Sequence, residues 1–284
     1  MTTSLIKKSS YTTIMKIKQK QIPQLLRNNT QSSITTSIRI NKALANAGVC
    51  SRRNADKYIL NGEVTINGKS ITQPGIYIHP DKDIIALHGR RVDIQLKNKK
   101  YYYLSMYKPI QVISSVRDPQ NRLTVLDFIP LPWKNYRLYP VGRLDFFSEG
   151  LLLITNDGEL TQRLTHPRYH ISKVYHVLIR ERVLNTTLKN MSKGIILSDG
   201  TKLPPTKVRV LSSITKTNTT WLEITLQQGI NRQIRRMCKA LGLTILKLIR
   251  VKQGNINLSN LQPGEVRLLK NEEVQLLKKN VQLI

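Results

Sequence analysis

Acidic residues are scarce in this sequence. Its 284 residues include 46 Lys and Arg against 17 Asp and Glu, which gives a formal net charge of +29, and the first 55 residues contain no acid. Such an excess of positive charge repels itself unless a polyanion neutralises it, and the release of counterions from phosphates favours that binding. The composition therefore predicts nucleic acid as the partner, ahead of an anionic membrane surface.

The sequence is also poor in cysteine and has no long apolar run. Its two cysteines, Cys50 and Cys238, are far apart and form no CxxC pair, so neither a disulfide framework nor a zinc site is indicated. This usage of cysteine is typical of a reducing compartment. No apolar segment approaches the ~20 residues that a membrane span needs. We therefore expect no membrane partner.

Residues 1–37 are basic and rich in Ser, Thr, Lys and Gln, and we predict that they form a disordered N-terminal tail. An organelle transit peptide has a similar composition, but it favours Arg, and Arg27 is the only arginine before Arg39. A start upstream of the true one, with Met15 as the second candidate, is a further reading. We expect a cytoplasmic protein, with a mitochondrion or plastid as the alternative.

Residues 38–95 have the pattern of a compact unit of two helices and a hairpin. Gly48 is a plausible left-handed cap that ends the first helix, and Ser51 can cap the start of the second. Asn67-Gly68 is a strong signal for a two-residue hairpin turn. The two helices carry a group of cations with no acid before Asp56, which favours a phosphate-contacting face over an ordinary solvated one: Arg39, Lys42, Arg52, Arg53 and Lys57.

This unit resembles the small RNA-binding module named after ribosomal protein S-four. The segment "SRRNADKYILNGEVTINGK" carries the resemblance. In that family the helices and the hairpin grip structured RNA, largely through backbone contacts. The resemblance implies an RNA-binding first domain.

After a charged linker at 96–100, residues 101–270 alternate between short strands and short helices, and residues 271–284, rich in Lys and Gln, are predicted to be a C-terminal tail. The predicted fold class is α+β, with a mixed, mostly antiparallel sheet and flanking helices after the small first domain. The expected strands are 101–106, 111–115, 151–155, 173–180, 207–211, 220–226 and 246–251. The expected helices are "GELTQRLT", "NTTLKNMSKG" and "NRQIRRMCKALG".

The helix "NRQIRRMCKALG" places apolar residues on one face and cations on the other. The cations are Arg232, Arg235, Arg236 and Lys239. Because no acid is interleaved, like charges repel along this face, and phosphates or a buried carboxylate are needed to offset them.

Asp145 is the natural carboxylate candidate. It follows Arg143, just ahead of the apolar run 151–154. A turn-forming Asp that bonds its own backbone is the ordinary alternative. An acid in a cationic RNA groove is costly unless it is paired or takes part in chemistry, which favours a functional role.

The motifs together resemble those of the RNA pseudouridine synthases, in the branch that modifies uridines in ribosomal RNA and carries an S-four-type module. The segments are "YPVGRLDFFSEGLLLITNDGEL", "KPIQVISSVRDPQNRLTVLDFIP", "KVYHV" and "GINRQIRRMCKALG". The resemblance implies that uridine is isomerised to pseudouridine without a cofactor or metal. It also implies catalytic roles for Asp145, Tyr175 and Arg235, with Tyr175 stacking on the base and Arg235 pairing with Asp145.

The resemblance leaves several alternatives open. Asp145 could attack the anomeric carbon or remove a proton from the neighbouring sugar carbon, and Tyr175 could be a core tyrosine of its strand. Arg143 and Arg232 are candidates for filling the vacated base stack. The substrate is expected to be structured ribosomal RNA, large-subunit RNA favoured, as a hairpin or assembly intermediate, with no obligate protein partner. A non-catalytic assembly factor and a glycosidase-like hydrolase are the rival functions.

Overall fold

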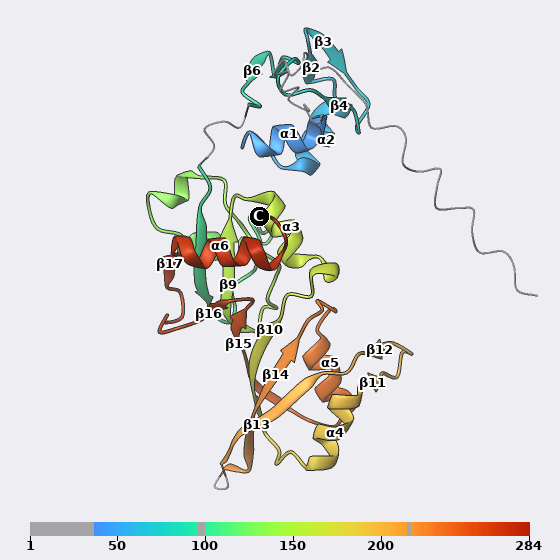
Figure 1. Ribbon diagram of the computed structural model, residues 1–284, viewed down its shortest axis with the longest axis vertical. Helices are drawn as coiled ribbons and strands as arrows, with labels where there is room; N and C mark the ends of the chain where they lie inside the picture. Colours follow the sequence, from blue (N-terminus) through green and yellow to red (C-terminus); the bar gives the residue numbers. More distant parts are fainter. Residues whose placement is uncertain (1–36, 96–99, 215–216) are drawn as a thin grey trace, which may run out of the picture.

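The computed structural model describes residues 37–95, 100–214 and 217–284. The predicted tail 1–37 and the linker 96–100 therefore lie outside the described residues, except for Ser37 and Lys100. Figure 1 shows a small domain at one end of an elongated molecule and a larger sheet domain that makes up the rest.

The small domain packs two helices on a short sheet. Ser51 caps α2 by accepting from the Asn54 amide at 3.0 Å, and Asn67 and Gly68 both take positive φ in the β2–β3 hairpin, as predicted. The apolar faces of all these elements form one core. The elements are β1 Ile38–Arg39, α1 Ile40–Asn46, α2 Arg52–Leu60, β2 Val64–Ile66, β3 Lys69–Ile71, β4 Tyr77–Ile78, β5 Ile85–Leu87 and β6 Arg90–Val92.

The larger domain is built on a sheet with the strand order β13-β14-β10-β15-β9-β7-β17. Every pairing along this order is antiparallel except that of β9 with β15, which confirms the mixed, mostly antiparallel α+β prediction. The strands are β7 Tyr103–Lys108, β8 Tyr139–Pro140, β9 Glu149–Thr155, β10 Lys173–Ile179, β11 Ile195–Ile196, β12 Lys202–Leu203, β13 Lys207–Ile214, β14 Thr219–Leu226, β15 Ile245–Gln253, β16 Ile256–Asn257 and β17 Val266–Leu268.

Helices cover this sheet in two groups, because its two halves bury different apolar faces. Figure 1 shows α3 and α6 beside β9, and α4 and α5 at the far end against β10 and β14. In β9, Leu151 and Leu153 face the core that holds α3 and α6, whereas Leu152 and Ile154 face a second core. Burial on both faces explains the unbroken apolar run. The helices are α3 Gly158–Thr165, α4 Asn185–Lys193, α5 Gln233–Ala240 and α6 Asn271–Asn280, with short 3-10 turns η2 Val125–Phe128, η3 Trp133–Asn135 and η4 Pro167–Tyr169.

The strand predicted over 111–115 does not form. Ile113 makes only an isolated bridge with Thr124. Gln111 takes a positive φ of 60° and donates its amide to the Phe146 carbonyl at 2.7 Å. The backbone groups of this segment bond to the loop that carries Asp145, through Gln111, and to Leu123 and Val125, through Ile113, and not to the sheet.

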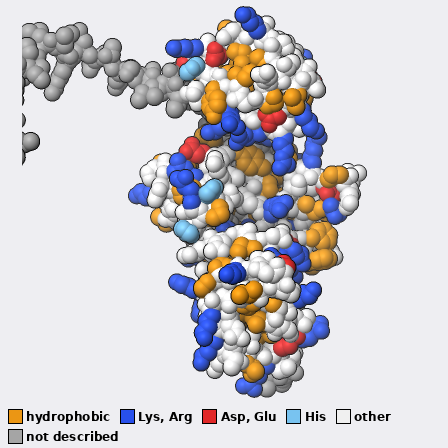
Figure 2. Space-filling view, turned by 90° about the vertical axis from the view of Figure 1, so that its right-hand side faces the viewer, with side chains coloured by type: hydrophobic (Ala, Val, Ile, Leu, Met, Phe, Trp, Pro, Cys, Tyr) orange, Lys and Arg blue, Asp and Glu red, His pale blue; other side chains and the backbone are white. Residues whose placement is uncertain are grey.

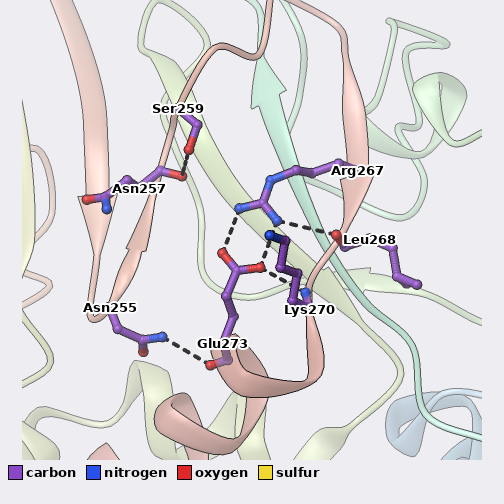
Figure 3. A network of polar contacts seen from close by, with 7 residues as sticks. All are labelled: Asn255, Asn257, Ser259, Arg267, Leu268, Lys270 and Glu273. Atoms are coloured by element: carbon purple, nitrogen blue, oxygen red, sulfur yellow. Dashed lines mark hydrogen bonds and ion pairs between the residues drawn. The ribbon is translucent and has the colours of Figure 1, made fainter.

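The predicted C-terminal tail is wrong, since residues 271–280 form helix α6. Val274 and Leu277 are buried in the core beside β9. Figure 3 shows how the helix is tied down: Glu273 receives two 2.8 Å bonds from the Arg267 guanidinium, and its carbonyl accepts from Asn255. The sequence did not reveal this amphipathic helix, because Lys and Gln fill its exposed face and its apolar stripe is only a few residues long.

Gly150 lets β9 and β15 approach at the one parallel pairing in this order. It pairs with Arg250 and has a φ of +101°. A Cβ at this position would collide with the backbone oxygen of Arg250 and lie 2.8 Å from its backbone nitrogen. Only glycine fits this close approach, which holds the Asp145 loop against the other half of the sheet.

Candidate active site

A pocket of about 300 Å³ opens where the two halves of the sheet meet. The loop before β9 lines one side of it, through Arg143 and Asp145, and the start of α5 lines another. Tyr175 of β10 and Arg250 of β15 come from the strands between them. The topology therefore brings together segments that are far apart in sequence.

The Asp145 loop is held by its backbone and its neighbours. The Ser114 hydroxyl donates to the Leu144 carbonyl at 3.0 Å and accepts from its amide at 3.1 Å, and the Ser148 amide donates to the carbonyl of Asp145. Within the described residues the Asp145 carboxylate accepts no hydrogen bond from its own turn. This argues against the turn-forming alternative and leaves the side chain directed at the pocket.

The Asp145 carboxylate faces two guanidinium groups. Its Oδ2 lies 3.6 Å from Nη1 of Arg232 and 3.6 Å from Nε of Arg235. The carboxylate side chain is 34% exposed and that of Arg235 is 20% exposed, so the pair is only partly screened by water. The acid that the cationic helix needed is thus present beside it.

Arg235 is fixed onto the loop that carries Asp145. Its Nη2 donates to the Phe147 carbonyl at 2.7 Å and to the Ser148 hydroxyl at 3.0 Å. Burial lowers the pKa of Arg235, and the nearby charge of Asp145 opposes that shift. The side chain therefore acts as a clamp that holds the loop and the carboxylate in one geometry.

The predicted four-cation face of the helix is not continuous. α5 begins at Gln233, and Arg232 precedes it in a left-handed conformation with φ of 49°. Arg236 turns away from the pocket and pairs with Asp199 at 2.6 Å, while Lys239 is exposed and does not line it. The structure thus brings Arg232 and Arg235 to the site, and it separates Arg236 and Lys239 from it.

Tyr175 lies on β10 with its ring among the pocket-lining side chains, between two cores. It pairs with Ile224 on one side and Arg250 on the other. Tyr175 can therefore be both a core residue and a functional residue, because its ring packs against the cores and also lines the pocket.

Sequence reasoning missed several polar residues behind and beneath the site. Lys108 is fully buried and donates from Nζ to the carbonyls of Pro109 and Ser148 at 2.7 and 2.8 Å. Burial lowers its pKa to about 8, against the charges of Asp145 and Glu149. Lys173 and Gln253 also line the pocket. Lys173 could have been found from its spacing, since it shares a strand face with Tyr175.

The predicted RNA-binding cations of the small domain are all exposed: Arg39, Lys42, Arg52, Arg53 and Lys57. Figure 2 shows Lys and Arg side chains spread over one face of the molecule from the small domain to the far lobe, with few acids between them. Lys42 shares a groove with Arg163 and Arg168 of the larger domain. A basic surface therefore continues from one domain to the other.

The described residues offer neither a metal site nor a membrane-spanning helix. Among them no group of His, Cys, Asp or Glu could hold a metal ion. None of the helices in the described ranges is long and apolar enough to cross a membrane.

Comparison with known proteins gives the class that this fold and site define. The model of the RNA pseudouridylate synthase family matches residues 102–240, and that of the S4 domain matches residues 38–84. The ribosomal large subunit pseudouridine synthase B of Bacillus subtilis is 39% identical over 84% of this chain and 95% of its own. An uncharacterized RNA pseudouridine synthase of Aquifex aeolicus is 40% identical over 87% of this chain and 96% of its own.

A solved pseudouridylate synthase structure agrees, with a TM-score of 0.59, 27% identity, and cover of 85% of this chain and 100% of the other. The chain belongs to the RNA pseudouridine synthase family. It is an enzyme of that family with an N-terminal S4 RNA-binding domain, and its substrate is RNA.

Proposed function

We propose that the enzyme converts one uridine, or a small set, in structured large-subunit ribosomal RNA to pseudouridine, with Asp145 as the catalytic carboxylate. The observation that carries this proposal is the placement of Asp145 Oδ2 at 3.6 Å from both Arg232 and Arg235, in the pocket that Tyr175 also lines. The match to a large-subunit enzyme of Bacillus subtilis supports the choice of RNA.

The chemistry requires a carboxylate in this place. The bond between the ribose anomeric carbon and N1 of uracil breaks, the base turns, and C5 joins the sugar. Asp145 either attacks the anomeric carbon or removes the proton from the neighbouring sugar carbon, and both routes need a charged oxygen in a partly dry site. Arg235 holds it there, since its other nitrogen is fixed on the same loop.

The target base must leave its RNA helix to enter this pocket, at a cost of a few kcal/mol. Tyr175 offers an aromatic face for the flipped base. Arg143 and Arg232 line the pocket wall, which supports assigning them to contact phosphate or fill the vacated stack. The exposed cations of the small domain and the groove of Lys42 offset the cost through phosphate contacts.

Tritium release tests the proposal. Ribosomal RNA transcripts carrying tritium at C5 of uracil are incubated with the wild-type enzyme and with Asp145→Asn, and RNA binding is measured in parallel. We expect release from wild type, loss of release in the variant, and unchanged binding. Binding without release in wild type would instead identify an assembly factor, and free uracil would identify a hydrolase.

For the compartment, we propose the cytoplasm, because the cysteine usage fits a reducing environment. A mitochondrion or plastid is the alternative. Fusing residues 1–37 to a fluorescent protein distinguishes them, since import of the fusion into an organelle would overturn the proposal.

A further inference from the structure

Buried polar atoms without partners gather at the active-site pocket. In the described part of the chain, seven buried side-chain nitrogen and oxygen atoms lack a hydrogen-bond partner, and five of them belong to residues that line this pocket. Native proteins pair the great majority of such atoms, because an orphan loses its hydration without compensation. The simplest reason why these unpaired atoms gather at the pocket is that a polar ligand supplies their hydrogen bonds. The five are Oε1 of Gln233, Nε of Arg235, Nη2 of Arg250, and both Oε1 and Nε2 of Gln253. Nε of Arg235 already faces the Asp145 carboxylate at 3.6 Å, so the other four atoms carry the argument.

Gln253 stands out, since its entire amide is unpaired while its side chain is fully buried. An irregularity in β15 directs it to the pocket. Tyr175 pairs with Arg250, but its neighbour Val174 pairs with Lys252, so Val251 is an extra residue. In a regular strand Lys252 would share a face with Arg250, whereas the bulge places Gln253 there.

Lys173 lies directly opposite Gln253 in this pairing and also lines the pocket. Its ammonium group donates to the Ile171 carbonyl at 3.3 Å. Burial, and then the charge of Arg250, lower the pKa of Lys173 to about 8. Arg250 is 2% exposed and donates from Nε to the Leu151 carbonyl at 2.7 Å, which leaves its Nη2 unpaired. We call Lys173, Arg250 and Gln253 the pocket floor.

The pocket floor is cationic and includes no acid, while Asp145 is already matched by two arginines. A ligand with electronegative oxygens would therefore offset the positive charge of the pocket floor. The imide edge of uracil has this chemistry, because its N3–H donor lies between the carbonyl oxygens O2 and O4. A glutamine amide presents the complementary acceptor and donor side by side.

We propose that the pocket floor binds the uracil base, with the Gln253 amide on N3–H and one flanking oxygen, and with Lys173 and Arg250 at the carbonyl oxygens. This inference rests on the proposed pseudouridine synthase function. It assigns recognition of uracil to three residues outside the Asp145 loop and α5.

The proposed contacts suit both halves of the reaction. When the C1′–N1 bond breaks, its electron pair leaves with the base, and the negative charge spreads over N1, O2 and O4. The two cations of the floor stabilise that charge. The base then turns by half a revolution about its N3–C6 axis, which exchanges N1 with C5 and O2 with O4. N3–H stays in place, so Gln253 keeps its hold while C5 bonds to C1′, loses its proton, and N1 gains one.

The test compares Gln253→Leu and Lys173→Met with a matched control, Lys252→Met, which changes the neighbouring residue on the opposite face of β15. Single-turnover tritium release from large-subunit ribosomal RNA transcripts, RNA affinity and melting temperature are measured for each. We expect release to slow by about tenfold or more in both floor variants and to stay within about twofold in the control. RNA affinity should hold, because phosphate contacts dominate it.

Melting temperature separates recognition from a structural role. Replacing an unpaired buried amide with leucine removes an orphan, so Gln253→Leu should melt at the same temperature or higher while it turns over more slowly. A lower melting temperature together with a normal rate would overturn the inference.

A second measurement needs no change in the protein. A hairpin whose target uridine is replaced by 3-methyluridine lacks the N3–H donor, and wild type should convert it at least about tenfold more slowly than the uridine hairpin. Equal rates on the two hairpins would overturn the contact with Gln253. If wild type releases tritium and Asp145→Asn does not, but both floor variants match wild type, this inference fails while the proposed function stands. If wild type releases none, the proposed function fails first.

Discussion

Oδ2 of Asp145 lies 3.6 Å from Nε of Arg235, while Nη2 of the same arginine donates to the loop that carries the aspartate. One side chain thus supplies the opposing charge and also fixes its distance. Because the carboxylate is already held in position, little entropy is lost in orienting it when the transition state forms.

Arg235 should tolerate no replacement. Arg235→Met is expected to lower the single-turnover rate by about 100-fold or more, as removal of a positioned charge does. Arg235→Lys keeps the charge but cannot hold the Phe147 carbonyl and the Ser148 hydroxyl together with the carboxylate, so an intermediate loss is expected. Ser148→Ala removes one contact and should cost less than either. Equal rates for the lysine variant and wild type would contradict the clamp.

Gly150→Ala should destabilise the fold strongly. The substitution adds a side chain at a positive φ and forces β9 away from β15, at an expected cost of about 2–4 kcal/mol. Gly200→Ala is the matched control, since its φ is +79° and nothing lies within 4 Å of the added Cβ. The control should cost about 1 kcal/mol. Denaturant unfolding measures both, and similar losses would show that the close approach to Arg250 is unimportant.

Helix α6 should contribute to stability through one face. Leu277 is 1% exposed in the core, whereas its neighbour Leu276 is 47% exposed. Leu277→Ala is expected to lower the free energy of unfolding by about 2–5 kcal/mol, and Leu276→Ala by less than about 0.5 kcal/mol. Chemical denaturation of the two variants provides the check. Equal effects would mean that the helix does not pack as described.

The charge of Lys173 should make the reaction rate fall at alkaline pH. It is protonated below its pKa of about 8 and loses its charge as pH rises through that value, with Arg250 as the facing cation. The wild-type rate should therefore fall above pH 8, and bound RNA, being anionic, should move the midpoint upward. Lys173→Met should show a smaller fall than wild type. Lys108, with a similar pKa, is present in both proteins, so their difference isolates Lys173.

The small domain should set affinity more than rate. Combined replacement of Arg52, Arg53 and Lys57 by Gln removes three exposed cations from α2. The slope of log affinity against log salt should fall by about 2–3, since each of the three phosphate contacts contributes about 0.7–0.9. The rate at saturating RNA should not change. An unchanged slope in a filter-binding titration would remove this face from the RNA interface.

The sequence by itself determined the class of fold, the RNA partner and the candidate catalytic residues. Charge balance is a property of composition, and the motifs around Asp145, Tyr175 and Arg235 are short and local. The apolar run of β9 and the Asn67-Gly68 hairpin were equally readable, since a short apolar run and turn chemistry are both properties of a few consecutive residues.

Only the tertiary structure decided what those residues face. Arg236 pairs with Asp199, whereas Arg232 and Arg235 face Asp145, and helical spacing alone cannot show which partner each arginine meets. The burial of Lys108 depends on Ser148, 40 residues away, and the helix at 271–280 packs against β9, more than a hundred residues away. The pocket floor depends on a bulge between two strands, so Gln253 acquires its place from register, a long-range property that no local pattern encodes.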